Sequence, residues 1–318
     1  MKKSLLTLLL SALLLLSACG GAPAGTPGQE EDVVHILATT YPVYLLTTAV
    51  TGGLEDIQVD LLVKDQISCL HDYTLTVNDM KAIESADIIV MNGVGLEDFM
   101  SDALSKSSAT VIDCSQGIDL LPYEGHEDHD EDHGETGHWD PHIWMDPNNA
   151  RQMGENIQAG LSAADPDHKD AFDANATQAW ADLGAAYEQW SVTLNEGGDG
   201  YDWRKLITFH DGFGYFAHAY GFTILKAIEE EEGSEASAAD IKEIVTLIEE
   251  EHLPAIFTEV NGSTSTAEAI QRETGVGVSS LNMIMSGQGS GIQPYLDAME
   301  DNIQTLIHAL GNSEVTVP

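Results

Sequence analysis

One segment holds most of the residues of this chain that could do chemistry. Residues 125–147 read GHEDHDEDHGETGHWDPHIWMDP and contain five histidines among carboxylates: His126, His129, His133, His138 and His142. Neutral imidazole and carboxylate oxygen are the ligands that borderline-soft divalent metals such as zinc take. The first half of the segment is polar and of low complexity, whereas His142 stands in an apolar frame between two prolines. We interpret the segment as an accessory metal-collecting loop that leads into one fixed ligand, His142.

Three further polar side chains follow predicted strands. His71 comes after the second strand, His210 directly follows Leu206 to Phe209, and Glu259 directly follows Ala255 to Thr258. Ligands in open α/β sheets bind at the carboxyl ends of the strands. We therefore expect these side chains to converge with His142 in a cleft. Five other histidines match no motif, and we expect them to be ordinary core or surface residues: His35, His168, His218, His252 and His308.

The start of the chain predicts export and a lipid anchor. Lys2 and Lys3, the apolar run Leu5 to Leu16 and the small residues before Cys19 have the form of a signal peptide, residues 1–18. The run is shorter than the roughly 20 apolar residues of a membrane-spanning helix. Cys19 lies where a lipobox cysteine is cleaved and lipidated, although an ordinary signal peptide with an incidental cysteine is an alternative. Residues 19–32 form a Gly/Pro/Ala tether.

The net charge of the chain indicates which kinds of partner it can bind. The chain has 318 residues, 53 of them acidic against 12 basic, and a net charge of −41. Such a surface repels nucleic acid and concentrates cations, although solubility alone could explain it. We therefore exclude nucleic acid as a partner. We expect the protein to be extracytoplasmic because of its export signal, and we also expect it to be a monomer.

Cysteine usage fits an exported protein. With Cys19 lipidated, Cys69 and Cys114 remain as a pair that could form a disulfide in an oxidising compartment. Two free thiols are the main alternative. Cys69 as a metal ligand, two residues before His71, is a third.

Short β-rich runs alternate with helical ones after the tether, which predicts parallel α/β folding. We assign residues 33–145 to an N-terminal lobe that includes the histidine-rich loop, residues 124–138. Its predicted strands are Val33 to Ala38, Ile57 to Val63, Asp87 to Met91 and Thr110 to Asp113. Its predicted helices are Val43 to Val50, Val77 to Ser85 and Leu96 to Leu104.

The pattern changes to a helical segment at residues 146–196. Asp146-Pro147 and Asp165-Pro166 each have the form of an N-cap followed by proline at the first helical position. The β/α alternation resumes in residues 197–312, which form the predicted C-terminal lobe. Its other predicted strands are Phe222 to Lys226 and Val276 to Ser279. Its predicted helix starts are the capping boxes Ser237 to Asp240 and Ser265 to Glu268, the second helix ending at Gly275.

These motifs together resemble one family, the substrate-binding lipoproteins of bacterial ABC transporters for zinc and manganese. The resemblance covers essentially the whole mature chain. It is carried by the lipobox at Cys19, His71-Asp72-Tyr73, the histidine-rich loop, the DPHIWMDP string from Asp140 to Pro147, the HDGFGYF string from His210 to Phe216, and Phe257-Thr258-Glu259.

The resemblance implies two (β/α)4 lobes with parallel sheets, joined by one long rigid helix, and a metal site in the cleft between the lobes. When the metal ligands of the family are carried over to the matching positions of this sequence, they are His71, His142 and His210. The implied partner is a membrane permease, and the cargo is a divalent metal ion. Trp139 and Trp144 are expected to pack around the site rather than to bind.

Two departures from the family pattern leave the fourth ligand open. Thr74-Leu75 stands where many relatives have a carboxylate-proline pair, and Asn282 stands where an aspartate usually supplies the fourth ligand. Glu259 or a water molecule could fill this position, since zinc accepts three protein ligands plus water. Glu259 could equally cap the helix that follows it.

The residue types favour zinc over manganese, because manganese members of the family tend to have a carboxylate where this chain has His210. A surface zinc hydrolase is the alternative, since three histidines and water can be catalytic. However, the chain has no His-Glu-x-x-His motif and no nucleophile elbow. Passive metal buffering would leave the DPHIWMDP and HDGFGYF strings unexplained. We therefore predict a zinc receptor and not an enzyme.

Overall fold

The computed structural model describes residues 33–64, 70, 73–122, 139–197, 203–229, 237–260, 262 and 264–311. Residues from Val33 onward form one compact unit. Within the described ranges no helix is both long and apolar enough to span a membrane.

The N-terminal lobe is built on a parallel four-stranded sheet. Its strands are β1 (Val34–Ala38), β2 (Ile57–Leu61), β3 (Ile88–Met91) and β4 (Thr110–Asp113). They are arranged in the order β2-β1-β3-β4. Its helices are α1 (Tyr41–Thr51), α2 (Val77–Ser85), the 3₁₀ turn η1 (Asp98–Met100) and α3 (Ser101–Leu104). The helix predicted over Leu96 to Leu104 is therefore broken into a 3₁₀ turn and one short α-helical segment.

The C-terminal lobe repeats this plan. Its strands are β5 (Lys205–His210), β6 (Thr223–Glu229), β7 (Ala255–Glu259) and β8 (Gly277–Leu281), in the parallel order β6-β5-β7-β8. Its helices are α6 (Gly214–Tyr220), α7 (Ala238–Glu251), α8 (Ser265–Thr274) and α9 (Gln293–Leu310). The predicted fold of two parallel α/β lobes is confirmed. Helices α6 and α9 are additions that the sequence analysis does not place.

The strand order fixes where each sheet can hold a ligand. Connections leave β1 and β3 in opposite directions in the first sheet, and they leave β5 and β7 in opposite directions in the second. Such a switch point between adjacent strands opens a crevice at their carboxyl ends. His210 is the last residue of β5, and Glu259 is the last residue of β7. Both therefore lie at the switch point of the second sheet.

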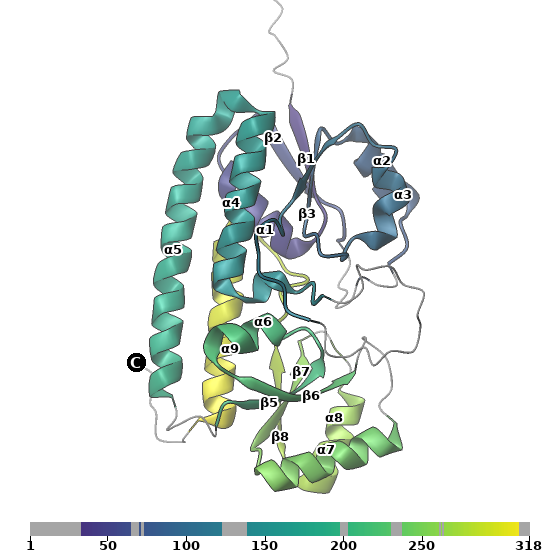
Figure 1. The fold of residues 1–318 in the computed structure, drawn as a ribbon, viewed down its shortest axis with the longest axis vertical. Helices are drawn as coiled ribbons and strands as arrows, with labels where there is room; N and C mark the ends of the chain where they lie inside the picture. The colour runs from purple at the N-terminus through teal and green to yellow at the C-terminus, as the bar shows by residue number, and fades with distance from the viewer. Residues whose placement is uncertain are drawn as a thin grey trace, which may run out of the picture. The chain divides into compact units, whose positions relative to one another are not determined.

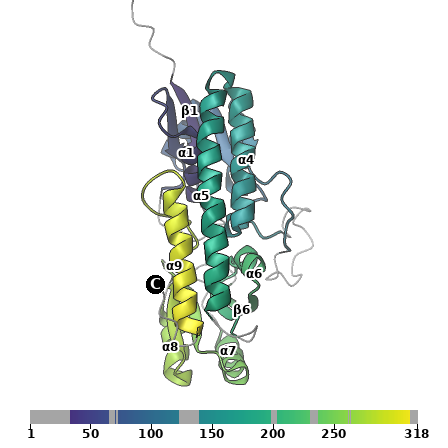
Figure 2. The same ribbon diagram turned by 90° about the vertical axis from the view of Figure 1, so that its left-hand side faces the viewer.

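Two helices connect the lobes (Figure 1). The chain passes through η2 (Ile143–Met145), α4 (Pro147–Ala164), η3 (Pro166–His168) and α5 (Lys169–Glu196). Helix α5 has 28 residues, which makes it about 42 Å long at 1.5 Å per residue. It packs against α1 and α4 at one end and against α9 at the other, and Figure 2 shows α9 alongside it.

Both predicted N-cap positions of this region are confirmed, but only one of the two carboxylates makes a capping hydrogen bond. Asp146 caps α4 as expected, its carboxylate accepting a hydrogen bond from Asn148 N at 2.8 Å. Asp165 is the N-cap residue of η3 and Pro166 is the first residue of this turn, but the Asp165 carboxylate makes no capping hydrogen bond and instead contacts His168 Nδ1 at 2.7 Å. The pKa of His168 is raised, chiefly by this hydrogen bond and also by Asp56. The imidazole thus outcompetes the backbone amides for the carboxylate.

Of the two capping boxes predicted in the C-terminal lobe, one is confirmed and the other is wrong. Ser237 Oγ accepts a hydrogen bond from Asp240 N at 3.2 Å, and Ser237 N donates one to Asp240 Oδ2 at 2.9 Å, so the first box is confirmed. The second is wrong by one residue, because α8 begins at Ser265 and its N-cap is Thr264, which donates from its hydroxyl to Glu268 at 3.2 Å. Gly275 ends α8 with φ 77°, as predicted.

Two hydrophobic cores stabilise the part of this unit that the structure describes. The larger one runs without a break from the N-terminal sheet through the bridge helices to α6 and α9 of the C-terminal lobe. Its largest fully buried side chains include Trp144, Phe172 and Tyr295. The smaller core lies between the second sheet and helices α7 and α8. The bridge is therefore packed into the same core as both lobes, and is not a free linker.

Candidate metal centre

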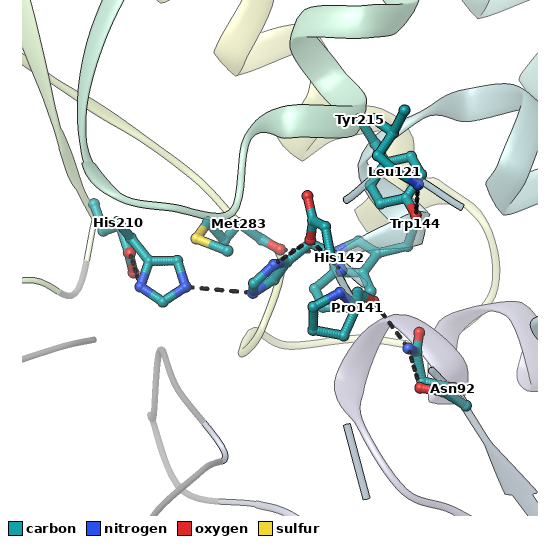
Figure 3. Close-up of polar contacts among 11 residues, drawn as sticks. Asn92, Leu121, Pro141, His142, Trp144, His210, Tyr215 and Met283 are labelled. Carbon is teal, nitrogen blue, oxygen red and sulfur yellow. Dashed lines mark hydrogen bonds and ion pairs between the residues drawn. The ribbon is translucent and has the colours of Figure 1, made fainter. Parts of the chain in front are cut away.

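The structure brings two of the predicted ligands together. His142 lies just before η2, and His210 ends β5. Their Nε2 atoms face each other at 3.3 Å (Figure 3). Each residue is only 3% exposed. The two rings meet edge to face, with centroids 5.1 Å apart. Two residues 68 positions apart in the sequence therefore offer one ring nitrogen each to the same point.

A carboxylate stands behind each imidazole. Asp140 Oδ1 lies 2.7 Å from His142 Nδ1, and Glu259 Oε1 lies 3.5 Å from His210 Nδ1. An ionised carboxylate can only accept a hydrogen bond, so it favours the tautomer with the proton on Nδ1 and a lone pair on Nε2. Both carboxylates therefore favour the form in which the two facing nitrogens can bind a cation.

This geometry bears on the prediction for Glu259. Its carboxylate contacts His210 on Nδ1, whereas the two nitrogens that face each other are Nε2. Among the residues that the structure describes, no group of three or more His, Cys, Asp or Glu side chains could hold a metal ion. The described part of the chain thus supplies two imidazoles, each with a carboxylate beside its Nδ1 atom.

Other predicted site residues lie outside the described residues. These are His71 and Cys69, and the four histidines of the loop, His126, His129, His133 and His138. Cys114 is buried and forms no disulfide with a described residue. Its pairing with Cys69 therefore stays a prediction.

Asn282 makes hydrogen bonds inside the second lobe. Its side-chain oxygen accepts from Ile284 N at 2.7 Å, and its backbone N–H donates to Asn302 Oδ1 at 2.7 Å. Ile284 has a positive φ of 62°, which is unusual for a β-branched residue. The carboxamide of Asn282 therefore stabilises a strained turn.

Two glycines after β5 let the side chains of the site approach. A Cβ at Gly212 would lie 2.7 Å from His210 Cδ2, 3.2 Å from His142 Cδ2 and 2.2 Å from Met283 Cε. A Cβ at Gly214 would lie 2.7 Å from Asp140 Oδ2. The sequence analysis quotes both glycines within the HDGFGYF string but assigns them no role. The signal that could have marked them is their position two and four residues after the candidate ligand His210.

Both lobes hold the segment that carries His142. Asn92 Nδ2 donates to Pro141 O at 2.9 Å from the N-terminal lobe. From the C-terminal lobe, Tyr295 OH donates to Trp144 O at 2.7 Å, and Trp144 Nε1 donates to Met283 O at 2.8 Å. Trp144 thus packs beside His142, as expected, while Trp139 is 43% exposed.

A buried carboxylate supports Asn92. Glu97 accepts hydrogen bonds from Thr39 Oγ1 at 2.7 Å, from Asn92 N at 2.7 Å and from Gly93 N at 3.1 Å. These donors follow β1 and β3, so Glu97 fills the switch point of the first sheet. Burial raises the pKa of Glu97 to about 7, against the opposing effect of these hydrogen bonds. The sequence analysis did not identify Glu97, since one Glu in a loop carries no signal.

The raised pKa of Glu97 predicts a pH-dependent stability. The folded chain holds this proton up to about pH 7, whereas the unfolded chain releases it near 4.5. The free energy of unfolding should therefore fall as pH rises from about 4.5 to about 7, at about 1.4 kcal/mol per pKa unit, or about 3 kcal/mol in total. Urea unfolding across this range should show a flatter profile for Glu97→Gln than for wild type. Parallel profiles would contradict the prediction.

The chain has two α/β lobes with the same strand order, a long helix packed against both, and two facing imidazoles between the lobes. These features define the class of two-lobed substrate-binding receptors for metal ions. The chain belongs to one family of that class: the family model of zinc-uptake complex component A, periplasmic (ZnuA), matches residues 36–309. The resemblance stated from the sequence is confirmed. Members of the family are metal-binding solute receptors and not enzymes, and they work outside the cytoplasm with ABC transporter permeases.

Individual relatives span nearly the same length. The high-affinity zinc uptake system protein ZnuA of Bacillus subtilis (strain 168) is 29% identical over 320 residues, which cover 97% of this chain and 98% of that protein. The manganese-binding lipoprotein MntA of Halalkalibacterium halodurans is 26% identical over 318 residues, 98% of this chain and 99% of that protein. The crystal structure of a Zn(II)-bound AdcAII variant of Streptococcus pneumoniae covers 88% of this chain and 99% of its own, with 27% identity and a TM-score of 0.74.

Proposed function

We propose that this protein is the receptor of a zinc importer, which captures Zn²⁺ between its lobes and delivers it to an ABC permease. The observation that carries the proposal is the 3.3 Å separation of His142 Nε2 and His210 Nε2. Two nitrogens each about 2.0–2.1 Å from one tetrahedral zinc ion lie about 3.3–3.4 Å apart. The pair is therefore already spaced as two ligands of one ion.

We assign the third imidazole to His71 and the fourth position to Glu259 or to water. Glu259 would have to leave its contact with His210 Nδ1 to reach the ion. Imidazole ligands suit zinc, whereas oxygen-rich sites suit manganese. The manganese-binding relative makes manganese the second candidate cargo.

The remaining parts of the chain have supporting roles in this proposal. Lipidated Cys19 anchors the protein to the membrane, and residues 19–32 tether a unit made of lobes 33–145 and 197–312 with the bridge 146–196 between them. The loop histidines, His126 to His138, collect zinc loosely and pass it to the site. The receptor acts as a monomer.

A competition titration of the purified protein tests the cargo and the role of the loop. Zinc and manganese are each titrated against a chelating dye, in the wild type and in a variant that lacks residues 126–138. One tight zinc site in both proteins, and weaker manganese binding, supports the proposal. Tight zinc binding that disappears with the loop would leave a surface metal buffer instead. Equal or tighter manganese binding would make manganese the cargo.

Uptake by cells tests delivery. Cells that lack the protein should accumulate less zinc under chelation, and wild-type protein should restore uptake only when the permease is present. Restoration without the permease would overturn the delivery step.

The two carboxylates behind the imidazoles provide a matched pair of variants. Asp140→Asn should lower zinc affinity by about 10- to 100-fold, because a partner on Nδ1 fixes the tautomer and the orientation of a ligand. Glu259→Gln should cost less, since the Glu259 contact is 3.5 Å and the Asp140 contact is 2.7 Å. The dye competition measures both, and thermal unfolding checks that each variant is folded. A larger loss in Glu259→Gln would instead identify Glu259 as a direct ligand.

A further inference from the structure

Met283 places the methyl end of its side chain beside the two imidazoles. Its side chain is 4% exposed. Its Cε lies 2.2 Å from the position that a Cβ on Gly212 would take, and the same position is 2.7 Å from His210 Cδ2 and 3.2 Å from His142 Cδ2. Cδ2 is the ring carbon bonded to Nε2. The end of the Met283 side chain thus lies beside both rings, and Figure 3 shows Met283 between His210 and His142.

The backbone of Met283 is held from both sides. Trp144 Nε1 donates to Met283 O at 2.8 Å. On the next residue, Ile284 N donates to Asn282 Oδ1 at 2.7 Å, and Ile284 takes its positive φ of 62°. A β-branched residue keeps such a backbone only where its surroundings determine it strongly, and such strain is concentrated at functional sites. The turn therefore fixes the residue that approaches the imidazoles.

The chemistry of these three side chains is softer than a zinc site requires. Thioether sulfur is a soft ligand that selects Cu(I), whereas imidazole suits both copper and zinc. The carboxylates of Asp140 and Glu259 contact the Nδ1 edges of the rings, away from the facing nitrogens. Two imidazoles and one thioether are enough ligands for Cu(I), which accepts low coordination numbers.

We propose that His142, His210 and Met283 form a binding site for Cu(I), with Met283 as the thioether ligand, in the same pocket that receives zinc. The inference rests on the proposed function, because it uses the same imidazole pair. It adds a second cargo or competitor of defined chemistry. Met283 then determines how strongly monovalent copper competes with zinc for the pocket.

An anaerobic competition titration tests the site. Cu(I) is titrated against bicinchoninate in wild type, Met283→Leu and His142→Ala, and zinc is titrated in the same proteins. Leucine keeps the apolar volume of methionine but has no sulfur, so the zinc titration of this variant shows whether the pocket itself is preserved. Cu(I) affinity should fall by about 10-fold or more in Met283→Leu. X-ray absorption at the copper edge should show a sulfur scatterer in wild type and none in this variant.

Each other outcome has a defined meaning. Equal Cu(I) affinity in wild type and Met283→Leu overturns the inference and makes Met283 an apolar wall of the pocket. Tight Cu(I) binding in His142→Ala also overturns it, because the copper is then held elsewhere. Repeating the titration on a variant that lacks residues 126–138 tests whether the loop histidines are that other place. Weak zinc binding by wild type would defeat the proposed function but would leave the Cu(I) comparison readable.

Discussion

Zinc affinity is expected to fall by more than about 100-fold in His142→Ala and in His210→Ala, since loss of a mere supporting partner of a ligand already costs about 10- to 100-fold. The two imidazoles meet at 3.3 Å, and each is buried. Removal of either ring leaves the other without its partner, in a pocket closed to most solvent. Dye competition on the purified protein measures the loss.

His308→Ala is the matched control for both variants. His308 is an exposed imidazole on α9 that contacts Gln304 O at 2.8 Å. Its removal deletes the same chemical group without touching the site, so the tight zinc site should be unchanged. A tight site that survives in both His142→Ala and His210→Ala would show that the ion is bound elsewhere. Such a result would end the proposal for a site between the lobes.

Gly212→Ala should weaken zinc binding to a similar degree, although it removes no ligand. Its new Cβ would lie 2.7 Å from His210 Cδ2, which is closer than real Cβ contacts come. The flexible end of Met283 can move aside. His210 is the last residue of a central strand, so its ring must turn or shift. Because ligands need their orientation fixed, we expect a loss of about 100-fold in zinc affinity.

Gly184→Ala is the control for this substitution. Gly184 lies within α5, and a Cβ there would meet no atom within 4 Å. Alanine in a helix interior is favoured over glycine by up to about 1 kcal/mol, so this variant should bind normally and melt at an equal or higher temperature. Normal zinc binding by folded Gly212→Ala would show that the pocket can widen, and that the close approach over Gly212 is not required.

Local patterns in the sequence predict much of this protein correctly. The alternation of apolar runs predicts eight strands in two lobes, and the strand ends place His210 and Glu259 correctly, because parallel strands bring their carboxyl ends to one edge. The prolines and aspartates around His142 mark a fixed segment, since Asp146 and Pro147 start a helix by local geometry alone. The error at Ser265 is also local, since the neighbouring Thr264 takes the N-cap position.

Tertiary structure decides what each of these residues contacts. No spacing in the sequence shows that Glu259 contacts His210 on Nδ1, that Met283 reaches both rings over Gly212, or that Glu97 supports Asn92 and through it Pro141. The contacts between Asn92 and Pro141 and between Trp144 and Met283 join residues 49 and 139 positions apart. The sequence by itself determined the fold class, through local periodicity, and the family, through the motifs that carry the resemblance. Only the packing of the two lobes around the bridge decided the orientation and support of the imidazoles, because those depend on distances between segments that sequence order does not encode.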